Sequence, residues 1–174
     1  MVYSTDGTTR RRLDAGGLLA MADVLSDAFM SHDNWKRVIP DEPGRKRALY
    51  RLFAFLGAVS NEYGHIVVTT EGGAPVGYTT FMENRDRSQV TLARILKAGA
   101  FPHALRFLAA LSPRGLGGMA AFNTAIARFY RTYDPDPEGL HLYNTGIVPA
   151  FRGKGLMKRS FLYAESRFRS AGFT

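Results

Sequence analysis

The chain has 174 residues, of which 45% are hydrophobic, and this length and composition predict a single domain, residues 1–174, with a packed core. It has no cysteine, its four histidines lack metal-ligand spacing, and no apolar run approaches the ~18 residues that span a bilayer, so we expect no disulfide, no metal site and no membrane partner. The formal charge of +8 suits a polyanionic ligand, but the basic residues are scattered and match no nucleic-acid-binding motif, so we expect a cytoplasmic protein without a nucleic-acid partner.

The first half of the chain predicts a strand, two helices and a β-hairpin. Residues 8–13 favour a short strand. Apolar residues recur at helical spacing across 15–30 and 45–63, with a break at 31–34 and a turn at 41–44 between them. β-branched residues at 65–70, a glycine-containing loop at 71–75 and a second apolar run at 76–82 predict the hairpin.

The second half predicts a helical insert followed by a strand, a loop and a helix. A polar segment at 83–88 closes the hairpin, and helices are predicted at 90–98, 103–111 and 119–133, with a turn at 112–115. A proline-containing loop at 134–139 leads to a strand at 140–148 and a helix at 158–171. This order predicts an α/β fold with a mixed sheet flanked by helices.

The segment between the last strand and the last helix carries the clearest chemical signal. Gly153 and Gly155 lie there beside Arg152 and Lys154. A strand, a glycine loop and a helix in this order direct backbone N–H groups and the positive end of a helix dipole at one point. The segment therefore predicts a phosphate or pyrophosphate site, although its spacing fits neither the P-loop nor the dinucleotide fingerprint. A glycine turn that caps an ordinary helix is the alternative.

The same segment resembles motif A of the GNAT superfamily of N-acetyltransferases, which is Gln/Arg-x-x-Gly-x-Gly/Ala after a strand that ends Leu-Gly-Val-x-Pro. Residues 145–149 match the strand end, and Arg152, Gly153, Lys154, Gly155 and Leu156 match the motif in order. Met157 departs from it, because the family usually has Gly or Ala there. The helical insert and residues 28–41 are more loosely similar to the puromycin N-acetyltransferase-like branch. The resemblance implies the GNAT fold.

The resemblance also implies an activity, the transfer of an acetyl group from acetyl-CoA to a primary amine of a small molecule by direct attack. Gly146, Ile147 and Val148 are then expected to form a bulge whose N–H groups bind the thioester oxygen and the pantetheine arm. Residues 152–157 are expected to bind the pyrophosphate. Gly146 is alternatively an ordinary strand glycine, and Met157 either packs into the core or narrows the phosphate cradle.

A base for the attacking amine is harder to find. The resemblance suggests His141, four residues before Thr145, where the histone-acetylating branch has a carboxylate, although a hydrogen-bonded strand-end histidine is the favoured alternative. Glu138 and Tyr143 are further candidates. Five aromatic residues are candidates for an acceptor pocket, but their helical spacing is more typical of core residues: Trp35, Phe53, Phe122, Phe129 and Tyr130.

The resemblance places the general acid and a further strand beyond residue 174. We therefore expect the strand at 140–148 to present an unpaired edge and the chain to form homodimers through it. Two other functions compete with acetyl transfer: a non-catalytic acyl-CoA-binding or interaction module, and a basic nucleic-acid-associated protein. The acceptor amine cannot be read from the sequence.

Overall fold

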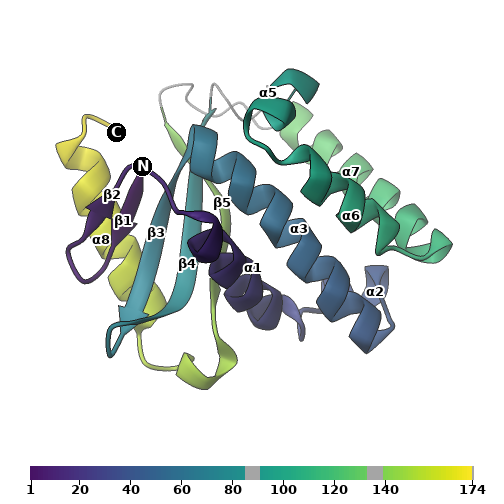
Figure 1. Ribbon diagram of the computed structural model, residues 1–174, viewed down its shortest axis with the longest axis horizontal. Coiled ribbons are helices and arrows are strands. Elements are labelled where there is room, and N and C mark those ends of the chain that lie inside the picture. Colours follow the sequence, from purple (N-terminus) through teal and green to yellow (C-terminus); the bar gives the residue numbers. More distant parts are fainter. Residues whose placement is uncertain (85–90, 133–138, 174) are drawn as a thin grey trace.

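The computed structural model describes residues 1–84, 91–132 and 139–173, and helices cover both faces of its central sheet (Figure 1). The strands are β1 (Val2–Ser4), β2 (Thr9–Arg10), β3 (Gly64–Glu71), β4 (Ala74–Glu83) and β5 (Leu140–Ile147). The helices are α1 (Ala15–Phe29), α2 (Asp33–Val38), α3 (Glu42–Tyr63), α5 (Leu92–Lys97), α6 (Phe101–Ala109), α7 (Pro113–Thr132) and α8 (Leu156–Ser170), and η1 (Pro149–Phe151) is a 3-10 turn. The predicted α/β class is confirmed.

The sheet has the strand order β2-β1-β3-β4-β5 and is mostly antiparallel. β1 is the exception, because it pairs parallel to β3, with Val2 opposite Ile66. The predicted hairpin is formed by β3 and β4, and β5 pairs antiparallel to β4. In the described part of the chain, β5 is therefore the edge strand of the sheet beside α1.

The core lies on both faces of this sheet. On one face α1 and α3 cover the strands, and Leu25, Leu49 and Ile66 are fully buried between them. On the other face α8 packs its apolar side against the strands, with Phe168 near Phe81 in an edge-on arrangement. Helices α5, α6 and α7 lie on the side of α3 away from the sheet (Figure 1).

Several predicted boundaries are wrong. The strand expected at 8–13 is limited to Thr9–Arg10, and the sequence did not predict β1. The expected turn at 112–115 is instead the first turn of α7, where the Ser112 hydroxyl oxygen accepts from Gly115 N at 3.1 Å. Residues 85–88 of the predicted polar segment and 134–138 of the predicted loop lie outside the described residues.

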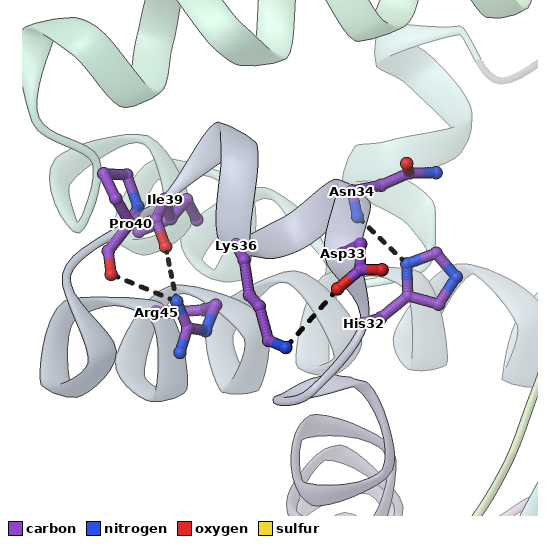
Figure 2. Close-up of polar contacts among 7 residues, drawn as sticks. All are labelled: His32, Asp33, Asn34, Lys36, Ile39, Pro40 and Arg45. Atoms are coloured by element: carbon purple, nitrogen blue, oxygen red, sulfur yellow. Dashed lines mark hydrogen bonds and ion pairs between the residues drawn. The ribbon is translucent and has the colours of Figure 1, made fainter.

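A short helix, α2, stands where the sequence predicts a break and a connection. Its link to α3 is held by Arg45, whose side chain is buried in the first turns of α3. The Arg45 Nη1 donates to the carbonyl oxygens of Ile39 at 3.0 Å and Pro40 at 3.2 Å (Figure 2). These two bonds fix the chain that leaves α2. No helix of the described residues is long and apolar enough to cross a membrane.

Candidate functional site

The segment between β5 and α8 turns twice through glycine. Gly153 and Gly155 have φ angles of +79° and +68°, a left-handed conformation that glycine adopts without steric cost. No atom lies within 4 Å of the point where a Cβ would stand at either position. The backbone of this loop is therefore accessible to a ligand, as its glycines predict.

The N-terminus of α8 lacks the side-chain cap with which α1 and α3 begin. Asp14 caps α1 and Asp41 caps α3, each with a carboxylate oxygen 2.7 Å from a first-turn amide nitrogen. Gly155 takes this place in α8, where no side-chain bond caps the helix and the first turn contains no acidic residue. The first amides of α8 and its positive dipole end therefore favour an anion.

A cleft of about 530 Å³ lies beside this helix end, within the range of small-ligand pockets. It is bounded by the C-terminal end of α1, the end of β5 and the glycine loop. Its lining residues are Ala28, Phe29, His32, Thr145, Gly146, Ile147, Phe151, Arg152, Gly153, Gly155, Leu156, Met157 and Lys158. The structure thus brings most of the predicted cofactor-binding residues to one cleft.

Gly146 is a point of close approach between β5 and α1. A Cβ there would lie 2.8 Å from the Cβ of Ala28 and 2.9 Å from a methyl carbon of Leu25. The pairing of β5 with β4 is regular at this point, with Gly146 opposite Tyr78. The expectation of a bulge at 146–148 is therefore wrong at Gly146, whose lack of a side chain instead lets α1 pack against the strand.

The irregularity of β5 lies further back along the strand. Thr80 faces Asn144 and Phe81 faces Leu142, so Tyr143 is the extra residue. The strand end is regular, and Val148 N donates to Val76 O at 2.9 Å. Because bonded and non-bonded pairs alternate along an antiparallel ladder, the Ile147 amide points away from β4. Among the three predicted strand-end donors, the Ile147 N–H is the one that faces the outer edge.

The basic residues of the loop have different surroundings. Arg152 bridges the loop to α1, since its Nη2 donates to the Ala28 carbonyl oxygen at 2.5 Å and its Nε to the Ile147 carbonyl oxygen at 3.4 Å. The Lys154 Nζ lies 4.7 Å from the ring centre of Phe151. Arg152 thereby holds the C-terminal end of α1 against the loop, and both cations add positive potential beside the uncapped end of α8.

Met157 packs in the core and also forms part of the cleft wall, which are the two positions that the sequence leaves open. It packs beside Ile147 and Leu156 in a small apolar cluster, and it also lines the cleft. The Thr145 hydroxyl donates to its sulfur at 2.9 Å. Its half-buried side chain is therefore part of the wall between α8 and β5.

The two catalytic candidates that the structure describes, His141 and Tyr143, do not line the cleft. His141 is half-buried in β5 opposite Met82, and Tyr143 packs beside the cluster that contains Ala58 and Met82. Neither belongs to the cleft lining. The third candidate, Glu138, lies outside the described residues.

His32 is a titratable residue of the cleft that the sequence analysis missed. Met30 and Ser31 separate it from α1, and it is the N-cap of α2, where its Nδ1 accepts from Asn34 N at 3.3 Å (Figure 2). The buried Arg45 holds the other end of α2, so this short helix is fixed at both ends. A histidine at the break between two helices, followed by Asn34, is the sequence signal that points to this cap.

The aromatic candidates are divided between the core and the surface. Phe53 is buried and its ring centre lies 5.1 Å from that of Phe29, and Trp35 packs against Phe122 at 5.8 Å. Phe129 is exposed, and the side chain of Tyr130 lies outside the described set. The core interpretation is therefore confirmed for Phe53.

Among the described residues, no group of three or more His, Cys, Asp or Glu side chains is arranged to hold a metal ion. Comparison with models of known protein families finds no match for this chain, and comparison with curated proteins finds none either.

Proposed function

We propose that this chain is an acetyl-CoA-dependent N-acetyltransferase of the GNAT fold that acts on a primary amine of a small molecule. One observation carries the proposal: a glycine loop with two left-handed residues joins the end of β5 to the uncapped N-terminus of α8, beside a cleft of about 530 Å³. This arrangement suits a ligand with a pyrophosphate at one end and a long neutral arm.

In this proposal the cofactor is held by the backbone more than by side chains. The amides of residues 153–157 bind the pyrophosphate, with Arg152 and Lys154 adding charge beside it. The pantetheine arm follows Gly146, Ile147 and Val148 along the edge of β5. Because the Val148 amide is bonded to Val76, the outward amide of Ile147 is the donor for the thioester oxygen.

Two histidines compete for the role of base. The family resemblance suggests His141, whereas His32 is the histidine that lines the cleft. A neutral imidazole suits proton transfer from an amine near neutral pH. If His32 is the base, His32→Gln lowers kcat and leaves acetyl-CoA affinity unchanged, while His141→Gln changes neither. The reverse result assigns the role to His141.

A non-catalytic acyl-CoA-binding module is the second candidate. The observation that favours it is the absence of a carboxylate from the cleft lining, which leaves His32 as the one ordinary base among the described residues there. In this case acetyl-CoA binds but is not consumed in the presence of primary amines.

The test compares Gly155→Asp with Gly155→Asn by calorimetry with acetyl-CoA. Both side chains tolerate a left-handed backbone and have nearly the same shape, so the pair differs in charge. We expect the Asp variant to bind at least about tenfold more weakly than the Asn variant, which is about 1.4 kcal/mol.

The matched control is Gly73→Asp, which adds the same charge at another open glycine, with φ of +80° in the β3–β4 hairpin. It is expected to leave acetyl-CoA affinity unchanged. Equal affinity of the two Gly155 variants would remove the pyrophosphate assignment. Tight binding without turnover of any primary amine would favour the non-catalytic module.

A further inference from the structure

The helices α5, α6 and α7 have an unusual charge composition. From Thr91 to Thr132 the sequence contains six Arg or Lys residues and no Asp or Glu. This stretch includes α5, α6 and α7, which lie on the side of α3 away from the sheet (Figure 1). Three of the seven α-helices in the described part of the chain thus follow one another with basic side chains and no acidic one.

The same helices expose large hydrophobic side chains. Six of them have exposed fractions between 44% and 61%: Leu92, Leu96, Leu105, Leu108, Leu116 and Phe129. Elsewhere in the described chain, three large hydrophobic side chains are exposed to a similar degree, and they are scattered over other elements: Met1, Leu19 and Leu162. We call the exposed side chains of α5, α6 and α7 the insert surface.

The inward contacts of these helices are made by other residues. Phe107 and Leu111 bury themselves in the main core, and Phe122 of α7 packs against Trp35 of α2. The exposed leucines are therefore not part of the contacts that hold the insert to α3 and α2. Burying them requires a partner outside the described residues.

Cations stand beside these apolar side chains along the helices. Lys97 follows Leu96, and Arg106 follows Leu105, and all four are exposed. Arg114 and Arg128 are likewise exposed within two residues of Leu116 and Phe129. Adjacent residues of a helix point about 100° apart, so Lys97, Arg106 and Arg128 each lie beside an apolar side chain.

We propose that the insert surface docks on an anionic lipid bilayer. Exposed Leu and Phe side chains bordered by Arg and Lys are the composition of helices that lie in the plane of a membrane interface, with apolar groups among the acyl chains and cations at the headgroups. The proposal concerns surface binding and departs from the sequence expectation of no membrane partner, which rested on the lack of a spanning segment.

Other partners match one part of this surface and not the other. Nucleic acid pairs with the cations but gives no apolar environment to the leucines. A second copy of the chain would bury the leucines but would bring together two surfaces whose charged side chains are all positive. An anionic bilayer matches both the charge and the apolar side chains.

The experiment is sedimentation with vesicles, without any acetyl-CoA. One set of vesicles is phosphatidylcholine alone, and the other is equal parts phosphatidylcholine and phosphatidylglycerol. We expect binding to the anionic vesicles, weakened by added salt, and much weaker binding to the neutral ones. The double variant Leu105→Ser/Leu108→Ser is expected to bind at least about tenfold more weakly.

Matched variants separate this surface from general effects. Leu19→Ser/Leu162→Ser replaces two exposed leucines elsewhere and is expected to bind like the unchanged chain. Lys97→Gln/Arg106→Gln is expected to weaken binding by about 25-fold, at about fivefold for each cation. Arg10→Gln/Arg11→Gln, which removes two exposed arginines near the N-terminus, is expected to have a much smaller effect. Circular dichroism melts check that each variant is folded.

Three results would overturn the proposal. One is equal binding of anionic vesicles by the Leu105/Leu108 double variant and the unchanged chain. Another is self-association that depends on these leucines in light scattering, with no vesicle binding, which would identify a second copy as the partner. The third is salt-sensitive binding to poly-glutamate or duplex DNA without vesicle binding, which would identify an acidic macromolecule.

Discussion

The close approach of β5 to α1 at Gly146 predicts that even a methyl group is too large there. In Gly146→Ala the new Cβ would begin 2.8 Å from the Cβ of Ala28 and 2.9 Å from Leu25. Carbon atoms in contact prefer about 3.5 Å or more, so α1 or β5 must move by about 0.7 Å. The Leu25 methyl can rotate away, but the Ala28 Cβ is fixed to the helix backbone.

This displacement sets the size of the expected effect. Overpacking of a core costs about 1–3 kcal/mol of folding free energy. Replacing glycine by alanine in an extended strand offsets up to about 1 kcal/mol of this cost, because alanine reduces the conformational entropy of the unfolded chain. We expect Gly146→Ala to lower the free energy of unfolding by about 1–2 kcal/mol and the Tm by about 2–8 °C. Urea and thermal unfolding measure both quantities.

The matched experiment adds Ala28→Gly, which removes the fixed atom. Although glycine near the end of α1 has its own cost, the double variant should be at least about 1 kcal/mol more stable than the sum of the single effects predicts. Gly117→Ala is the control, because no atom lies within 4 Å of its Cβ position inside α7, and it should raise stability by up to about 1 kcal/mol. Additive effects of the two changes, or an unaltered Tm for Gly146→Ala, would refute the steric explanation.

Four further predictions concern a methionine of the cleft wall, a buried hydrogen bond, a buried histidine and the edge of β5. Met157→Gly removes a half-buried side chain and introduces glycine in a helix, so we expect a loss of about 1–2 kcal/mol in urea unfolding and a wider cleft; tighter acetyl-CoA binding with an unchanged Tm would contradict the packing role. The buried Thr69 hydroxyl donates to the Ser160 oxygen at 3.0 Å, so Ser160→Ala should cost about 1–3 kcal/mol while Thr69→Val/Ser160→Ala costs less; equal losses would argue against this bond. Burial, with the nearby N-terminal charge, lowers the pKa of His65 in the folded chain. Stability is therefore lost below about pH 6.5, where the unfolded chain binds a proton at His65 more readily than the folded chain does. His65→Phe should reduce the fall in Tm between about pH 7 and pH 5, and an identical fall would show that His65 is not responsible. If the edge of β5 pairs with a second copy, Leu142→Lys should abolish a concentration-dependent dimer in light scattering, and an unaffected dimer would place that interface elsewhere.

The elements that the sequence predicts well are those with strong local patterns. Apolar spacing locates α1 and α3, and the glycines at 72 and 73 locate the hairpin of β3 and β4. The N-terminal strand β1 was missed because Val2–Ser4 is too short for a pattern and is stabilised by parallel pairing with distant β3. The start of α7 was missed because Ser112 and Pro113 favour both a turn and a helix start.

The candidate site likewise has local features that the sequence predicts and tertiary contacts that it does not. The glycine loop and α8 are local in sequence, and their conformations agree with the prediction. The bond from Arg152 to Ala28 joins residues 124 positions apart, and the approach of Gly146 to the same helix is nearly as distant in sequence. His32 reaches the cleft only because α1 packs beside β5. Such contacts depend on tertiary packing, for which no periodicity in the sequence gives a signal.

The position of β5 also bears on the order in which the molecule assembles. β3 and β4 are joined by a tight turn and need only a short loop closure, whereas β5 reaches β4 after residues 84–139 have been brought back to the sheet. We therefore expect the hairpin and α3 to form early and β5 to join late, with contacts of high sequence separation. A ligand in the cleft contacts β5 as well as α1 and α8, so its full set of contacts requires β5 to have joined the sheet. Such a ligand should slow unfolding while leaving the folding rate nearly unchanged, because its contacts form after the transition state.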